Sequence, residues 1–210
     1  MLKKKILKIF FIMIMFLIIF TPNAFAKSYH FKGFASQQVM DESGAWGTGI
    51  MNYMVKSMQK LEYNNYYGTN SYHTTSSKQD VLNYISMKGN NYGLSILAHG
   101  NQTGITMGDS NQFIYANDIS GIWHLVLIHS CSTFYNNTYA SAFQTVGYPH
   151  RAAIGFKDKV THSDGYYFWM VFHEYVGTTS LDAVVNIGKD LSEVPVVLWG
   201  DGSWNGYAWY

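Results

Sequence analysis

The chain has 210 residues, of which 48% are hydrophobic and 17% aromatic, so it can bury a core and an intrinsically disordered protein is excluded. Its formal net charge is only +1 and no basic patch is present, which excludes a nucleic-acid-binding protein. Cys131 is the only cysteine, so an internal disulfide framework is ruled out.

The first 26 residues have the pattern of a secretory signal peptide. Four lysines within the first eight residues give a positive start, residues 9–20 are an unbroken apolar run, and residues 24–26 read Ala-Phe-Ala, an A-x-A cleavage site. The run is too short for a membrane span. We expect cleavage after Ala26, a secreted protein and one domain over residues 27–210. Removing the four lysines leaves 10 basic against 13 acidic residues, a net charge of −3.

The first half of the mature chain predicts a strand, a helix and a second helix in that order. Residues 28–34 alternate as a strand does, and residues 46–61 place their apolar side chains on one helical face. Residues 62–76 are rich in Tyr, Asn, Ser and Thr and predict a loop with a short strand over 63–67. Ser77 to Asp80 has the spacing of a capping box and opens a helix over 80–86, with Gly89 as a plausible stop.

The second half predicts buried strands that alternate with helices. The strands are predicted over residues 92–100, 123–131, 151–156 and 194–199, and the helices over 137–147 and 166–176 and from a capping box at 179–182 through Ile187. Near-continuous apolar strands suit the interior of a parallel sheet that is covered on both faces. The pattern therefore predicts an α/β sandwich with a mostly parallel central sheet flanked by helices.

His99 and Cys131 stand at the carboxyl ends of two of these strands. Sites in parallel sheets form outside the carboxyl ends, so the two side chains can project into one crevice. A thiol nucleophile needs an acid or base and N–H donors for an oxyanion, and strand ends provide both. Gly100 allows a sharp turn and leaves space for a substrate carbonyl.

An apolar strand ending in His-Gly, followed by an apolar strand ending in x-Cys, resembles the caspase-like (clan CD) cysteine peptidases. That group includes caspases, metacaspases, legumain, clostripain, gingipain and the related CHAT domains. The residues that carry the resemblance are Ile96-Leu97-Ala98-His99-Gly100 and Leu125-Val126-Leu127-Ile128-His129-Ser130-Cys131. The resemblance covers residues 45–200 loosely and implies a three-layer caspase-like sandwich. It also fits a bacterial source, since the chain is rich in Lys and has one Arg.

The resemblance implies a role for each matching residue. Cys131 would attack the scissile carbonyl, His99 would protonate the leaving amine, and the backbone N–H groups of Gly100 and Cys131 would form the oxyanion hole. The specificity pocket would involve the segment before His99 and the loop after Phe156. The partner would be a peptide or protein substrate, with no nucleic acid, no membrane and no cofactor or metal.

The sequence departs from the family in two respects. His99 and Cys131 are 32 residues apart, which is shorter than in most peptidase members, and His129 stands two residues before the cysteine, where an acidic or small residue is common. These departures leave open a degenerate, non-catalytic relative.

Phe156 and two acids in the loop after it are candidate substrate-binding residues. Asp158 or Asp164 could accept a basic substrate side chain. A solvated loop acid or a helix cap is the favoured explanation of the two acids, and a cap suits Asp164.

Later histidines offer a different enzyme. His150, His162 or His173 could serve Cys131 in a papain-like or cell-wall hydrolase, but such folds place the cysteine at the start of a helix. His173, within an aromatic helix, and His124, on the opposite face of its strand from Cys131, are expected to be structural.

A cluster of aromatic residues at the end of the chain offers a non-catalytic reading. The cluster comprises Trp199, Trp204, Tyr207, Trp209 and Tyr210. It could bind sugars in a secreted binding module, although packing over the last strand explains it as well. The sequence contains no H-E-x-x-H, P-loop, G-x-G-x-x-G or G-x-S-x-G motif.

Overall fold

The computed structural model describes residues 29–66, 68–86, 92–108 and 112–208. The predicted signal peptide, Gly89, Trp209 and Tyr210 lie outside these ranges. Among the helices of the described residues, none has both the length and the apolar character that crossing a membrane requires.

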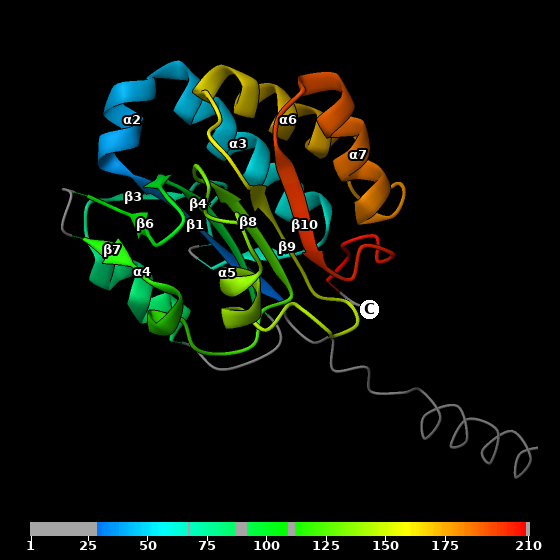
Figure 1. Ribbon diagram of the computed structural model, residues 1–210, viewed down its shortest axis with the longest axis horizontal. Helices are drawn as coiled ribbons and strands as arrows, with labels where there is room; N and C mark the ends of the chain where they lie inside the picture. The colour runs from blue at the N-terminus through cyan, green and yellow to red at the C-terminus, as the bar shows by residue number, and fades with distance from the viewer. Residues whose placement is uncertain (1–28, 67, 87–91, 109–111, 209–210) are drawn as a thin grey trace, which may run out of the picture.

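A seven-stranded sheet forms the centre of the molecule (Figure 1). Its order is β10-β9-β8-β4-β1-β2, with β3 also beside β1. The strands are β1 (His30–Ser36), β2 (Asn64–Asn65), β3 (His73–Thr75), β4 (Tyr92–Leu97), β8 (Leu125–His129), β9 (Ala152–Phe156) and β10 (Val196–Gly200). Among these described strands the pairings are parallel except that of β10 with β9.

Helices cover both faces of the sheet and complete a three-layer sandwich, as predicted (Figure 1). One face carries α2 (Gln37–Ser43), α3 (Ala45–Lys60), α6 (His162–Tyr175) and α7 (Leu181–Ser192). The other carries α4 (Lys78–Ile85), α5 (Thr138–Ala142), the 3-10 helix η1 (Ala116–Asp118) and a small antiparallel sheet of β5 (His99–Gly100), β6 (Ile105–Thr106) and β7 (Phe113–Ile114).

The central strand β8 shows why its sequence is apolar throughout. Leu125 and Leu127 pack into the core beneath α3, α6 and α7, whereas Val126 and Ile128 pack into the core on the α4 and α5 side. All four side chains are fully buried. Side chains alternate between the faces of a strand, so a strand covered on both faces needs apolar residues at every position.

The predicted strands and most of the predicted helices are present. The Ser77 hydroxyl accepts a hydrogen bond from the Asp80 N–H at 3.3 Å, as the capping box predicts. In the second capping box the cap is Ser180, which accepts from the Ala183 N–H, rather than Thr179. Helix α6 begins at His162, four residues earlier than predicted, because Thr161 caps it by accepting from the Asp164 N–H at 3.1 Å.

One prediction of secondary structure needs correction, and two features were not predicted. The helix expected over 137–147 ends at Ala142, because Gln144 and Gly147 have φ angles of 55° and 81°, which an α-helix cannot contain. Helix α2 and the small sheet β5-β6-β7 were not predicted, because the α2 segment has no helical apolar stripe and each small strand has only two residues.

Substituting Gly155 by Ala is expected to destabilise the fold, since a Cβ at Gly155 would overlap the Phe134 ring and lie 2.8 Å from the Ile128 carbonyl oxygen. We expect a loss of about 1–3 kcal/mol in the free energy of unfolding, measured by urea denaturation. The control Lys157→Ala removes an exposed side chain just beyond the same strand and is expected to change little. Equal stabilities for Gly155→Ala and the wild type would contradict this packing.

Candidate active site

The register of two neighbouring strands places His99 and Cys131 at the same edge of the sheet. Strands β4 and β8 are parallel, and their last paired residues are Leu97 and His129. The Ala98 N–H donates to the His129 carbonyl oxygen at 3.0 Å, which extends the ladder by one step. His99 and Cys131 each follow two residues after the last pair, so both emerge from the carboxyl ends of adjacent strands.

The turn that carries Cys131 is fastened to the end of β9. The Ser132 N–H donates to the Asp158 carbonyl oxygen at 3.1 Å, and the Phe134 N–H donates to the Phe156 carbonyl oxygen at 3.0 Å. Ser132 has a φ angle of 55°, a left-handed conformation that costs energy for a residue other than glycine. The turn therefore holds Cys131 half-buried, with its Sγ 3.6 Å from the Val160 carbonyl oxygen.

His99 is paired with a carboxylate that the sequence did not reveal. Its Nε2 lies 2.6 Å from Oε2 of Glu42, the next-to-last residue of α2, and both side chains are partly exposed. Gln38 donates to the other carboxylate oxygen at 2.9 Å. These hydrogen bonds, from Gln38 first and then from His99, lower the pKa of Glu42. A carboxylate only accepts, so Nε2 of His99 carries the proton and Nδ1 is free for chemistry.

A second imidazole, His129, is part of the core and not of the reactive surface. Trp169 on α6 donates its Nε1–H to Nδ1 of His129 at 3.1 Å, and the Phe156 ring lies 5.2 Å away between centroids. Burial, with lesser contributions from His162 and His99, lowers the pKa of His129 to about 3. Gly165 allows this packing, because a Cβ there would overlap the His129 ring.

A third imidazole, His162, lies between the other two at the first turn of α6. Its ring centroid is 6.4 Å from that of His99 and 6.2 Å from that of His129. Burial lowers the pKa of His162, the charge of His99 lowers it further, and Glu42 opposes the shift.

Within the described ranges, no three His, Cys, Asp or Glu side chains form a group that could hold a metal ion.

A pocket of about 480 Å³ opens beside Cys131. Its walls come from the residues after His99, the turn after β8 and the loop between β9 and α6. The lining residues are Gly100, Asn101, Cys131, Ser132, Lys159, Val160, Thr161 and Asp164. The pocket thus brings together Gly100, Cys131 and Asp164 of the predicted site residues.

The other two predicted substrate-binding residues lie elsewhere. Phe156 is fully buried against Phe168 and Trp169, so its side chain has no surface for a substrate and its placement in the substrate site is corrected. The Asp158 carboxylate accepts from the Lys159 N–H at 2.7 Å and is exposed in the loop. Asp164 both lines the pocket and accepts from the Thr161 hydroxyl at 2.6 Å within the α6 cap.

Two backbone N–H groups near the pocket, those of Gly100 and Cys131, take part in no backbone hydrogen bond within the described residues. The Asn101 N–H donates to the Gly104 carbonyl oxygen, so Gly100, the next residue along this antiparallel ladder, is at a non-hydrogen-bonded position. Among the described residues none accepts a hydrogen bond from the Cys131 N–H. A side chain at Gly100 would overlap the Ser130 hydroxyl, which explains the glycine.

Three other histidines lie away from the pocket beside Cys131. His150 precedes β9 and lies at its amino end, opposite the cysteine, beside Asp201 and Trp204. His173 lies about three turns further along α6 than His162, with Nδ1 3.4 Å from the Ser57 hydroxyl. His124 is buried beside Tyr29 and Trp204, as expected of a structural residue. Cys131 follows a buried strand, which contradicts a papain-like fold.

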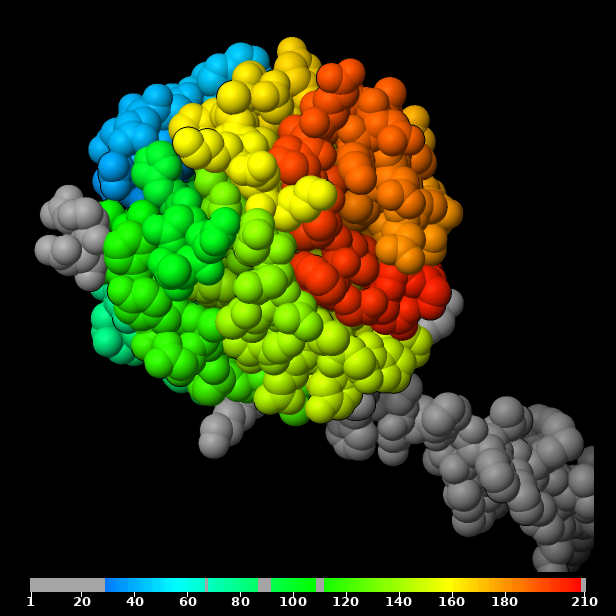
Figure 2. Space-filling model, viewed as in Figure 1, coloured from blue at the N-terminus to red at the C-terminus, as the bar shows by residue number. Residues whose placement is uncertain are grey.

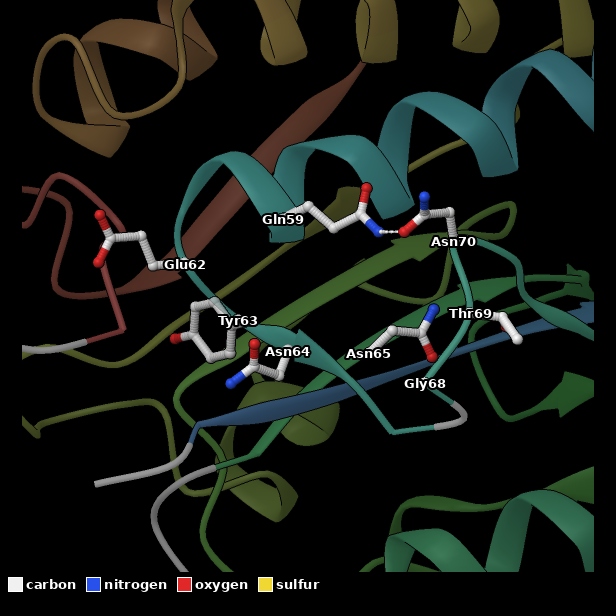
Figure 3. Close-up of a pocket in the computed structure, with 8 residues that line it drawn as sticks. All are labelled: Gln59, Glu62, Tyr63, Asn64, Asn65, Gly68, Thr69 and Asn70. Carbon is white, nitrogen blue, oxygen red and sulfur yellow. Dashed lines mark hydrogen bonds between the residues drawn. The ribbon is translucent and has the colours of Figure 1, made fainter. Parts of the chain in front are cut away.

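A larger pocket lies at the opposite end of the sheet, near the amino end of β1 (Figure 3). It has a volume of about 530 Å³ and a polar lining in which Gln59 donates to Asn70 at 2.9 Å. The lining residues are Gln59, Glu62, Tyr63, Asn64, Asn65, Gly68, Thr69 and Asn70. It contains neither a thiol nor an imidazole, so the Cys131 pocket is the better candidate for catalysis.

The aromatic residues near the chain end do not form an exposed sugar-binding surface in the described part of the chain. Trp204 is 4% exposed and packs in the core with α7, and Tyr207 packs against the same core. Trp199 is partly buried on the opposite face. These three side chains therefore pack against the core, as the packing alternative expects.

Comparison with known proteins supports the predicted fold. No family model and no curated protein matches the sequence. Among solved structures, the complex of Porphyromonas gingivalis RgpB pro- and mature domains matches with a TM-score of 0.55 and 10% identity, over 83% of this chain and 47% of that one. The Arg-specific cysteine proteinase gingipain R (RgpB) matches with a TM-score of 0.51 and 8% identity, over 83% and 46%.

The chain spans about half the length of these two structures, and the similarity at this identity is one of fold. It confirms the three-layer caspase-like sandwich that the His-Gly and Cys segments predicted.

The buried His129 is expected to make stability depend on pH. A lowered pKa means that the unfolded chain binds more protons between pH 6.5 and about 3, so stability falls as the pH falls through this range. His129→Gln keeps an acceptor for Trp169 but removes the titration. Urea denaturation at pH 7.5 and pH 5 is expected to show a smaller loss in this variant than in the wild type, by on the order of 2 kcal/mol. Equal losses would show that His129 does not titrate in this way.

Proposed function

We propose that this chain is a secreted cysteine endopeptidase, with Cys131 as the nucleophile and His99 as the acid and base. The observation that carries the proposal is the β4–β8 register, which brings His99-Gly100 and Cys131 to one edge of the sheet beside a pocket. The match to a cysteine proteinase of the same fold supports it.

The proposed reaction has two steps. The Cys131 thiolate adds to the scissile carbonyl, and the C–N bond breaks as the protonated His99 gives its proton to the leaving amine. Water then attacks the resulting thioester, and His99 takes up the proton from that water. The thiolate leaves, and the carboxylic acid product is released.

Two donors would stabilise the negative oxygen that forms in each step. The N–H groups of Gly100 and Cys131 are the candidates, because neither is engaged in a neighbouring backbone ladder. Donors that are already oriented toward the developing charge contribute most to such a reaction. The overlap that any Cβ at Gly100 would make with Ser130 fixes how closely this segment lies to the cysteine turn.

Glu42 is proposed as a positioning residue. Its carboxylate lies 2.6 Å from Nε2 of His99 and would fix both the Nε2–H tautomer and the orientation of the ring. Glu42 is in turn held by Gln38, one helical turn earlier on α2.

The pocket beside Cys131 is proposed to hold the substrate side chain that precedes the cleaved bond. Asp164 and Lys159 both line it, and the Asp164 carboxylate already accepts from Thr161. This mixed lining gives no ground for extending to this chain the arginine specificity named for gingipain R.

Secretion is proposed from the sequence. Residues 1–26 would direct export and be removed after Ala26, so that residues 27–210 form the active chain. The substrate would then be an extracellular peptide or protein, with no cofactor or metal in the chemistry.

Cleavage of a diverse peptide mixture by residues 27–210, read by mass spectrometry, tests the dyad. Cys131→Ala is expected to abolish cleavage, and His99→Ala to lower it by about 10²- to 10⁴-fold. His162→Ala serves as the matched control, because it removes the neighbouring imidazole. Cleavage that survives in His99→Ala but disappears in His162→Ala would transfer the acid–base role to His162. Cleavage that survives in Cys131→Ala, or none by the wild type, would overturn the proposal.

Glu42→Gln is expected to lower kcat several-fold to about tenfold, a modest effect because the pair is partly exposed. KM is expected to change little, because Glu42 contacts His99 and does not line the pocket. Asp41→Asn is the control, since Asp41 is the neighbouring exposed acid on α2 and pairs with Gln37. A raised KM with an unchanged kcat would contradict a positioning role for Glu42.

A further inference from the structure

Four aromatic side chains form a continuous surface where α3 meets α6. Trp46 and Tyr53 lie on α3, and Tyr166 and Tyr167 lie on α6. Tyr166 contacts each of the other three, with ring centroids 5.2 Å from Trp46, 5.4 Å from Tyr53 and 5.6 Å from Tyr167. We call this group the aromatic platform.

The platform is preformed and open to solvent. A Cβ at Gly49 would overlap the Tyr166 ring, so the glycine lets this ring lie directly against the backbone of α3. Trp46 is 42% exposed and Tyr167 is 48% exposed. Large exposed aromatic side chains that contact one another form a ready surface for a ligand, because they have few rotatable bonds to immobilise.

The platform begins about one helical turn along α6 from His162, the neighbour of His99. Tyr166 follows His162 by four residues on α6 and therefore lies on the same helical face, about 6 Å along the axis. His162 itself stands 6.4 Å from His99. Trp46 follows Glu42 by four residues across the junction of α2 and α3. Figure 2 shows the segment that leads into α6 (yellow) bordering both α2 (blue) and the small sheet (green).

We propose that the aromatic platform binds the leaving half of the peptide substrate and selects a large apolar or aromatic residue there. This rests on the proposed function, because His99 must reach the nitrogen of the leaving half in order to protonate it. The leaving half therefore departs over His99, whereas the pocket beside Cys131 holds the other half.

The distances set which residue reaches the platform. From His99 the path to Tyr166 is the 6.4 Å to His162 and then one helical turn, roughly 12 Å in total. An extended chain advances about 3.3 Å per residue, and an aromatic side chain reaches further still. The second or third residue after the cleaved bond is thus the one that stacks on Trp46 and Tyr167.

The cut-site profile of a peptide mixture tests this assignment. The wild type is expected to favour Phe, Tyr, Trp or Leu at the second or third position after the cut. The double variant Trp46→Ala, Tyr167→Ala is expected to lose the preference, with kcat/KM for such peptides lowered about 3- to 10-fold. Tyr175→Ala is the matched control, since Tyr175 is a 41% exposed tyrosine two turns further along α6. A profile that the double variant leaves unchanged would overturn the proposal.

Binding to an inactive chain separates this proposal from the catalytic one. The Cys131→Ala variant is mixed with the tripeptide amides Ala-Phe-Ala and Ala-Ala-Ala, which represent the leaving half, and saturation transfer to the peptide is measured by NMR. Transfer to the Phe ring, lost in Trp46→Ala, Tyr167→Ala, is expected even if the wild type cleaves nothing. Equal signals for the two peptides, or transfer only to an N-acetylglucosamine oligomer tested in parallel, would overturn the assignment.

Discussion

The parallel pairing of β4 with β8 is the constraint on which the site depends. The pair Leu97 and His129 ends the ladder, and the chain then diverges into two turns that carry His99-Gly100 and Cys131. A shift of one residue in this register would exchange the faces of every side chain in β8. The apolar residues of β8 would stay buried after such a shift, because both faces of the strand are covered. His129, however, would lose its contact with Trp169, and Cys131 would move out of the pocket. The register and the packing of α6 therefore support each other.

The site uses imidazoles in two opposite environments. His129 is kept neutral by burial and serves the packing of α6 on the sheet, whereas His99 is partly exposed and paired with Glu42. The His162 ring lies near both, and its pKa is lowered by burial and by His99. The Glu42 carboxylate, at 2.6 Å from Nε2, holds the His99 ring in one orientation. All three rings lie near one edge of the same sheet. The two environments therefore differ in how deeply each ring is buried in the sandwich.

Much of the fold was predictable because its signals are local. Apolar runs marked β4, β8 and β9, and the Ser77 cap marked α4. What the sequence could not reveal depends on contacts between distant segments. Glu42 meets His99 across 57 residues, and nothing in its neighbourhood suggests such a partner. Phe156 was placed in the substrate site from its position at the end of a strand, but its side chain is buried in the core. The loop before α6 was recognised, whereas its contribution of Val160 and Thr161 to the pocket required the structure.

The central claim is that His99 and Cys131 act as one unit. Alkylation of Cys131 by iodoacetamide, followed by mass spectrometry across a range of pH, measures the reactivity of the thiol without any substrate. We predict that the wild type reacts faster than His99→Ala at neutral pH and that His162→Ala resembles the wild type. Equal rates of alkylation for His99→Ala and the wild type would contradict the dyad, whatever peptides the chain is later found to cleave.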